Sequence, residues 1–568
     1  MPDSKGNHKR YGFLKSFGIT FLSWFCISQV SLIVLLISCN NDRKSEKGKT
    51  VFIYNESAGI SSLDPAFSKD QACIWPDNQL YNGLVQLDDK LDALPCIAKS
   101  YEISDDGLLY TFHLRNDVFF HDHELFKNKK GRKVTASDFV YSFKRIIDPK
   151  VASPGAWVFN YVNDSIGENK FNFKALNDST LLIMLSKPFP PFLSILSMQY
   201  CSVVPKEIVE YYGKDFRKHP VGTGPFKFKM WKEGVKLVLV KNENYFEFEG
   251  KERLPYLDAV DVTFNTDKQS VFLEFMKGNI DFMSGIDPAY KDVILTKKGT
   301  LNPEYNDKFK LITQPYLNTE YLGFLVDSVS PLLLNSPTRL KAIRQAVNIG
   351  FDKKKMIRYL RNNIGTAGIY GFIPAGMPSF DTSKIKGYDY NPELAKKLLA
   401  DAGFPNGEGL PEITLSTAAA YLDLVEYIQQ QLSEIGIKIK IDVNPPASLR
   451  EMIAKSKVVC FKGSWIADYP DAENYLSLFY SRNFCPKGPN YTHFKNKLFD
   501  DLYEKAQYLN NDSLRFHYYQ QMDSLIMAES PVVVLYYDQV LRFTQKNISG
   551  LGSNPMNLLT LKRVRKSN

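Results

Sequence analysis

A carboxylate set among aromatic side chains is the stretch of the sequence most suggestive of chemistry. Asp468 lies three residues after Trp465, and Tyr469 and Tyr475 follow it. An ionised acid in an apolar site costs free energy unless it finds a cation or takes up a proton. We hypothesise that the missing cation is the ammonium group of a ligand. The ordinary alternative is that Asp468 forms a turn or pairs with a nearby Lys or Arg.

The residues before Asp468 predict that it leaves a β-sheet. Val458 to Phe461 form an apolar run typical of a buried strand, and Lys462-Gly463 interrupts that run. Asp468 should therefore lie on the segment that follows the strand. Segments at strand ends are common places for ligands to bind.

Motifs for catalysis or metal binding are weak. No Gly-x-Ser-x-Gly nucleophile motif and no phosphate-binding glycine loop ending in Lys-Ser or Lys-Thr occurs. His121-Asp122-His123-Glu124 has groups that suit zinc, but strand-like spacing points alternate side chains apart. Gly222-Thr223-Gly224-Pro225 is best explained as a turn that enters a strand. We predict no enzymatic activity, no catalytic residue, no metal and no cofactor.

Length and charge limit the class of protein. The chain has 568 residues, of which 44% are hydrophobic, and single cores stop growing at about 250 to 300 residues, so we expect two or three lobes. The net charge of +9 includes +3 from residues 1–38. The remaining basic residues alternate with acids instead of forming a stripe, which argues against nucleic acid as a partner.

The first fifty residues predict export. Lys5, Lys9 and Arg10 precede the apolar stretch Gly18 to Ile37, which is the order of a secretory signal. Leu36-Ile37-Ser38-Cys39 resembles a bacterial lipobox, which implies that 1–38 is a signal peptide and that lipidated Cys39 anchors the chain to the cell envelope, on its periplasmic side. An uncleaved anchor helix is the alternative. The polar segment 39–50 should be a flexible tether.

Five cysteines follow the lipobox, and their number is odd. No pair has the spacing of a metal site, so at least one thiol should be free and buried, although the sequence leaves the disulfide pairing open. These residues are Cys73, Cys96, Cys201, Cys460 and Cys485.

Helical and strand-like patterns alternate along the rest of the chain. Apolar spacing predicts a helix from Asp77 through Leu87, and Asp106-Gly107 between alternating runs predicts a hairpin. Thr135 and Asp138 predict a capped helix that reaches Ile147. Later, a helix over 422–435 precedes a strand over 437–443. Such alternation predicts an α/β protein.

A series of short motifs resembles the family 5 extracellular solute-binding proteins, the oligopeptide and dipeptide receptors of bacterial ABC importers. The order and spacing hold from about residue 51 to 560. The motifs are Ser62-Leu63-Asp64-Pro65, Tyr81-Asn82-Gly83-Leu84, Phe112-His113-Leu114-Arg115, Val134-Thr135-Ala136-Ser137-Asp138, Pro220-Val221-Gly222-Thr223-Gly224-Pro225-Phe226, Arg344-Gln345-Ala346-Val347-Asn348 and the tract around Asp468.

This resemblance implies a two-lobed periplasmic-binding-protein fold of type II-like α/β architecture with an extra inserted domain. Two strand crossings, over 316–326 and 531–537, would form the hinge between the lobes. The implied boundaries are lobe I over 51–90, 195–315 and 532–560, inserted lobe II over 91–194, and lobe III over 316–531.

The resemblance also implies where a peptide ligand binds. In the family, an aspartate in a matching Trp-x-Ala-Asp motif holds the ligand's ammonium group, and Trp465 and Asp468 carry that motif here. Backbone groups of 463–466 and 69–73 should pair with the ligand backbone as an added strand. Trp157 could form a pocket wall or be a core aromatic residue. The predicted ligand-binding residues are Gln71, Cys73, Trp157, Gly463, Trp465, Ile466, Ala467, Asp468 and Tyr469.

The implied function is a monomeric, lipid-anchored receptor that captures short peptides and delivers them to an ABC permease. Relatives that carry nickel complexes, haem or oligosaccharides make those ligands the nearest alternatives. A receptor that signals without transport and an exported hydrolase also stay open. Peptide length and side-chain preference are not determined by the sequence.

Overall fold

The computed structural model describes residues 48–162 and 172–567. The predicted signal peptide and Cys39 lie outside the described residues. Residues 51–567, where described, belong to one compact unit. No helix within the described residues is long and apolar enough to span a bilayer.

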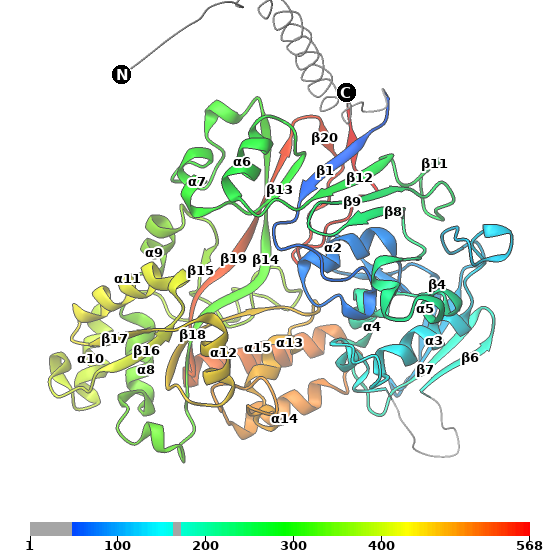
Figure 1. The fold of residues 1–568 in the computed structure, drawn as a ribbon. Coiled ribbons are helices and arrows are strands. Elements are labelled where there is room, and N and C mark those ends of the chain that lie inside the picture. Colours follow the sequence, from blue (N-terminus) through cyan, green and yellow to red (C-terminus); the bar gives the residue numbers. More distant parts are fainter. Residues whose placement is uncertain (1–47, 163–171, 568) are drawn as a thin grey trace, which may run out of the picture. The chain divides into compact units, whose positions relative to one another are not determined.

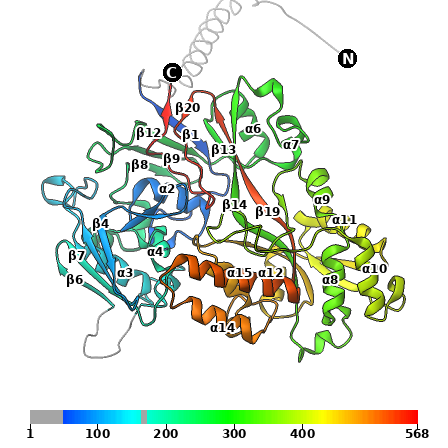
Figure 2. The same ribbon diagram turned by 180° about the vertical axis from the view of Figure 1, so that it is seen from behind.

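One large mixed sheet organises the fold (Figures 1 and 2). It has 11 strands, with short β15 pairing on the side of β19. In spatial order the other strands are β17 (Ile439–Val443), β16 (Ile413–Thr417), β18 (Cys460–Ile466), β14 (Phe309–Phe324), β19 (Val532–Gln545), β13 (Phe282–Ser284), β1 (Val51–Asn55), β12 (Ala259–Thr263), β9 (Lys236–Lys241) and β8 (Phe226–Lys232).

Two long antiparallel strands, β14 and β19, run through the middle of this sheet and lie side by side in both views. At one end β14 pairs with β18, and at the other β19 pairs with β13. The register between β14 and β19 shifts between Pro315 and Thr319 and again between Glu320 and Tyr321. The chain therefore links the two ends of the sheet through one irregular two-stranded ribbon.

A second, antiparallel sheet has four strands, in the order β4 (Ala98–Ile103), β5 (Leu109–Leu114), β7 (Thr180–Met184) and β6 (Phe173–Asn177). The hairpin predicted at Asp106-Gly107 connects β4 to β5, and Gly107 has a φ of +70°. The predicted capped helix is α3 (Ala136–Ile147), in which the Asp138 carboxylate accepts the N–H of Thr135 at 2.9 Å. Both predictions are confirmed.

The helix predicted over 77–87 is wrong in its bounds. The structure has α2 at Gln71–Leu80, followed by strand β2 (Val85–Leu87), which pairs with β3 (Ala93–Pro95). The N–H of Gly224 donates to the Leu80 carbonyl at 2.9 Å, so a distant segment takes the acceptor that a longer helix would use. Leu80 and Leu84 are buried all the same, which explains their misleading spacing.

The remaining elements complete the layers around the two sheets. They are α4 (Phe192–Ile195), α5 (Lys206–Tyr212), α6 (Lys268–Met276), α7 (Pro288–Ile294), α8 (Lys341–Ile349), α9 (Lys353–Leu360), α10 (Pro392–Asp401), α11 (Leu422–Ser433), α12 (Pro446–Ala454), α13 (Glu473–Leu476), α14 (Lys497–Ala506), α15 (Asp512–Glu529), β10 (Phe248–Glu249), β11 (Glu252–Arg253), β15 (Thr366–Ala367), β20 (Ile548–Ser549) and β21 (Arg565–Lys566).

Several apolar clusters fill the space between these elements. The largest packs β1, β12 and the four-stranded sheet, and two others pack the helices around β14, β16 and β18. More than one core was expected from the length of the chain. The five cysteines of the described residues are all buried and free, which confirms the expectation of at least one buried thiol.

Candidate functional site

Strand β18 carries the chain toward Asp468 and is longer than the sequence predicts. The break expected at Lys462-Gly463 is absent, because β18 continues to Ile466 while paired with β14. The Lys462 ammonium group is buried against the Glu320 carboxylate, so its charge does not end the strand. Gly463 faces Tyr321, whose ring would lie 2.6 Å from a Cβ at this position. Glycine therefore lets the two strands pack across an aromatic ring.

One edge of β18 is unpaired over its second half. Its parallel pairing with β16 includes only Cys460 and Phe461. The Ala467 N–H donates to the Leu317 carbonyl of β14 at 2.9 Å. Because backbone groups alternate in direction along a strand, those of Ser464 and Ile466 point away from β14, toward the open edge. Those of Gly463 point toward β14 instead, so Gly463 offers a ligand no free backbone group.

Asp468 follows directly and is held by an amide. The Asn474 side chain donates to the Asp468 carboxylate at 3.3 Å, while its oxygen accepts the Asp468 N–H at 3.2 Å and the Trp465 indole N–H at 2.9 Å. Asn474 therefore orients both landmarks of the predicted motif. Asn474 lies within α13 (Glu473–Leu476), six residues after Asp468, and no local pattern in the sequence marks it as this partner.

Asp468 lines a cavity of about 430 Å³. Among residues 48–162 and 172–567, no Lys or Arg lies within ion-pair distance of its carboxylate, so the alternative of a resident cation is wrong for this part of the chain. The side chain is exposed to the cavity, yet the surrounding protein desolvates it and raises the pKa of Asp468 above its usual value. The hydrogen bond from Asn474 partly opposes that rise.

The same cavity brings together most of the predicted residues. Gln71 at the start of α2, Trp157, and the run Ile466 to Tyr469 all line it. The rings of Trp157 and Tyr469 lie 6.1 Å apart at an angle of 35°. Residues that the sequence analysis did not single out complete the wall, among them Tyr200, Tyr316, Met198 and Met556. Their positions depend on tertiary packing, and no local pattern marks them.

Cys73 does not reach this cavity. Its side chain is fully buried and lies 3.3 Å from the Ser61 hydroxyl. Its N–H donates to the Asp70 carboxylate at 3.1 Å, the N-cap contact of α2. Because the backbone from Gln71 onward is helical, it cannot pair with a ligand as an added strand, and only the first N–H groups of α2 lack a helical partner. Trp465 lies at the neighbouring cavity described below.

Buried polar contacts support the segment behind Asp468. The hydroxyls of Tyr469 and Tyr503 both donate to the Glu473 carboxylate, which is buried. The Tyr475 hydroxyl donates to the Leu317 carbonyl at 2.6 Å, the same oxygen that accepts the Ala467 N–H. These bonds hold the loop rigidly and leave the Asp468 carboxylate as its unpaired acid.

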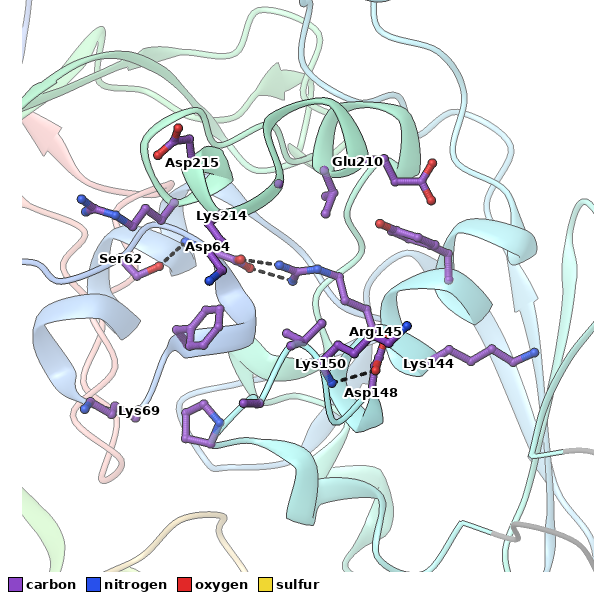
Figure 3. Close-up of a pocket in the computed structure, with 18 of the residues that line it drawn as sticks. Ser62, Asp64, Lys69, Lys144, Arg145, Asp148, Lys150, Glu210, Lys214 and Asp215 are labelled. Carbon is purple, nitrogen blue, oxygen red and sulfur yellow. Dashed lines mark hydrogen bonds and ion pairs between the residues drawn. The ribbon is translucent and has the colours of Figure 1, made fainter.

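A larger cavity of about 1050 Å³ lies elsewhere, among α3, α5 and the segment around Asp64 (Figure 3). Figure 3 shows Asp64 and Arg145 facing each other, joined by two hydrogen bonds of 2.9 and 2.5 Å. Its buried acid is therefore already satisfied by a resident cation. By size alone this cavity would be the better candidate for a binding site. The Asp468 carboxylate, which has no ion-pair partner among the described residues, lines the smaller cavity instead.

The two histidines considered as zinc ligands have other partners. One contacts backbone groups and the other contacts a tyrosine hydroxyl. His121 is buried, and its ring nitrogens lie 3.0 Å from the Gly224 carbonyl and 3.3 Å from the Gly222 nitrogen. His123 instead contacts the Tyr212 hydroxyl at 3.3 Å. Within the residues that the structure describes, no group of three potential ligands could hold a metal ion.

Comparisons with known proteins agree with this architecture. The sequence model described as bacterial extracellular solute-binding proteins, family 5 middle, matches residues 92–484. The chain is 30% identical to heme-binding protein A of Haemophilus influenzae over 510 residues, covering 87% of this chain and 88% of the relative. It is 24% identical to the dipeptide-binding protein of Escherichia coli, with coverages of 84% and 87%.

A solved structure gives the same fold. The ABC transporter-associated periplasmic binding protein DppA from Helicobacter pylori, in complex with the peptide STSA, superposes with a TM-score of 0.71 at 25% identity. The match covers 92% of this chain and 99% of that one. The expected two-lobed periplasmic-binding-protein fold is thereby confirmed, whereas the lobe boundaries stay a prediction.

Proposed function

Because the chain belongs to family 5 of the bacterial extracellular solute-binding proteins, we propose that it captures short peptides by their free amine and backbone. The observation that carries this proposal is the Asp468 carboxylate, which faces a cavity without a cation partner among the described residues. An acid in such a place favours a ligand that brings its own positive charge. Relatives that bind peptides support the same assignment.

The amine of the peptide would make the strongest single contact with the protein. A charge-assisted hydrogen bond from an ammonium group to a carboxylate is about twice as strong as a neutral one, and exclusion of water strengthens it further. The Asn474 amide holds the Asp468 carboxylate toward the cavity and has no charge that would repel the ligand. Trp157 and Tyr469 would cover the first residue of the peptide with aromatic surface.

The peptide backbone would then pair with β18. Ser464 and Ile466 direct backbone groups toward the open edge, and a peptide that runs away from Asp468 lies antiparallel to β18. Such an added strand gains affinity from main-chain hydrogen bonds that every peptide can make. Gln71, which lines the same cavity from the start of α2, would also contact the peptide.

The predicted export signal and the fold together support a wider proposal about where the protein acts. We propose that Cys39 carries a lipid anchor and that the monomeric receptor delivers peptides to an ABC permease. Two lobes, bounded as the sequence predicts, would close about the ligand by bending at β14 and β19. No covalent chemistry is part of this proposal.

Haem is the alternative that one comparison favours, since the relative with 30% identity is a heme-binding protein. Haem iron commonly takes His, Cys, Met or Tyr as an axial ligand. Met198, Met556 and Tyr200 line the cavity, but neither His nor Cys is among its described lining residues. A neutral oligosaccharide would bring no cation to the Asp468 carboxylate. A nickel complex would match that carboxylate less well than the ammonium group of a peptide.

Calorimetry with matched ligands tests the proposal. Di- to pentapeptides with a free amine should bind about 10- to 100-fold more tightly than the same peptides acetylated at the amine, because acetylation removes the charged hydrogen bond. Hemin, a nickel–histidine complex and an oligosaccharide serve as competitors. Equal affinity for free and acetylated peptides, or binding of hemin alone, would overturn the proposal.

A further inference from the structure

A third cavity, of about 370 Å³, lies alongside the open edge of β18. Strands β16 and β17 run parallel to each other, and β16 also runs parallel to β18, which continues past the end of their pairing. The cavity occupies the space beyond the carboxyl ends of β16 and β17, and α12 closes it. This is the place where open α/β sheets commonly receive ligands.

The lining of this cavity is mostly apolar and aromatic. Its walls include Tyr321, Ala418, Leu449, Ile453, Trp465 and Tyr491. Lys462 also borders it, but its ammonium group is paired with Glu320 and lies 3.6 Å from the centre of the Tyr421 ring. The buried wall therefore presents no unpaired charge from Lys462.

The size of the cavity suits one large side chain. Ligand pockets for whole small molecules span about 300 to 1,000 Å³, so 370 Å³ lies at the lower end of that range. An apolar wall of this kind gains free energy by burying aromatic or branched aliphatic groups. A charged side chain would lose its hydration there without finding a buried partner.

The distance between Asp468 and this cavity determines which residue of a bound peptide could place its side chain in the cavity. Trp465, the lining residue nearest to Asp468 along the strand, precedes it by three positions, or roughly 10 Å at about 3.4 Å per residue. A peptide whose amine binds Asp468 and whose chain follows the β18 edge places its third residue at that level. A dipeptide is too short to extend a side chain into this cavity.

We propose that this cavity is a specificity pocket for an aromatic or large aliphatic side chain on the third residue of the peptide. The inference rests on the proposed peptide-binding function and adds a length and a side-chain class to it. Peptides of three or more residues with an apolar third residue would be the preferred ligands.

A positional scan tests this inference. Calorimetry would compare Ala-Ala-Ala-Ala with the four tetrapeptides that carry one Phe at position one, two, three or four. Ala-Ala-Phe-Ala should bind at least tenfold more tightly than Ala-Ala-Ala-Ala, and more tightly than the other three. Ala-Ala-Asp-Ala should bind no better than Ala-Ala-Ala-Ala, even though Arg450 lies at the rim of the cavity.

Substitutions in the cavity separate its role from that of Asp468. Ala418→Leu fills the pocket and should remove the advantage of Ala-Ala-Phe-Ala while leaving affinity for Ala-Ala-Ala-Ala within twofold. Ala420→Leu, two positions away in the neighbouring cavity, is the matched control and should keep the advantage. Leu449→Ala enlarges the pocket and should shift the preference from Phe to Trp.

The outcomes distinguish this inference from the function on which it rests. Binding of all the peptides with no preference at position three, or an unchanged preference in Ala418→Leu, would overturn the pocket and leave peptide binding intact. Failure of every peptide to bind would overturn both.

Discussion

Two carboxylates next to cavities show how the same chemical group serves different purposes. Asp64 is buried and receives two hydrogen bonds from Arg145, at 2.9 and 2.5 Å. Asp468 is exposed to its cavity and receives one side-chain hydrogen bond, from the neutral Asn474 at 3.3 Å. An acid with a resident cation holds the fold together, whereas an acid supported by an amide retains a charge for something else. The partner of each acid therefore indicates its role better than the volume of the neighbouring cavity does.

The largest expected effect would come from breaking the Asp64–Arg145 pair. Arg145→Met leaves Asp64 buried without a cation, which should lower the free energy of unfolding by about 3–5 kcal/mol, measured by urea denaturation. Peptide affinity of the folded protein should stay within about twofold. The double variant Asp64→Leu, Arg145→Met should regain most of the loss, because no uncompensated charge is left. A loss below about 1 kcal/mol in Arg145→Met would show that the pair is not structural.

Asp468→Asn should have the opposite pattern. Peptide affinity should fall by about 10- to 100-fold, since the variant keeps the shape of the side chain but loses the charged hydrogen bond to the ammonium group. The free energy of unfolding should change by less than about 1 kcal/mol, because no resident ion pair is broken. Calorimetry and urea denaturation on the same sample measure both quantities. A large loss of stability with unchanged affinity would place Asp468 in the structural class with Asp64.

The third prediction concerns pH. Desolvation by the surrounding protein raises the pKa of the Asp468 carboxyl, so peptide affinity should decline as the pH falls through that raised value, when the protonated acid no longer attracts an ammonium group. Asn474→Leu removes the hydrogen bond that lowers this pKa, so the decline should begin at a higher pH. Affinity at neutral pH should fall about three- to tenfold. An unshifted pH profile would mean that Asn474 has only a structural role.

Trp157 should have the smallest effect of the four. Its ring packs against Tyr469 across the cavity, and such aromatic contacts contribute about 0.5–1.5 kcal/mol. Trp157→Ala should therefore weaken peptide binding by about two- to tenfold, as measured by calorimetry. Trp231→Ala, in strand β8 and outside the cavity lining, is the control and should leave affinity unchanged. Equal effects of the two substitutions would remove Trp157 from the site.

The sequence predicted the α/β class and the place of Asp468 after a strand, because both depend on local patterns, whereas its role in binding stays a prediction. Alternating apolar spacing marked the hairpin at Asp106-Gly107, and an acid among aromatic residues marked Asp468. The end of α2 could not be predicted, since it depends on a bond between Gly224 and Leu80, 144 positions apart in the chain. The predicted break of β18 at Lys462 was wrong because it also depends on a residue distant in sequence. The charge of Lys462 is neutralised by Glu320, which the local sequence does not reveal.

The walls of the site were equally hidden. Asn474 contacts Trp465 and Asp468 through its side-chain amide, and Tyr316 reaches the cavity from β14, so neither is marked by a local pattern. Cys73 was placed in the site by its neighbours in sequence, but the helix that begins at Gln71 turns its side chain into the core. Positions next to a helix start are easily misassigned, because a shift of one or two residues changes which side chains face outward.

The register shift between Pro315 and Thr319 has a mechanical consequence. Leu317 lies inside it, and its single carbonyl oxygen accepts both the Ala467 N–H and the Tyr475 hydroxyl, one on each side of Asp468. Flexure of the ribbon at this irregular point would therefore move the backbone on both sides of Asp468, and with it the proposed ammonium anchor. In the proposed mode of binding, capture of a ligand and bending of the two strands would be coupled through one oxygen atom.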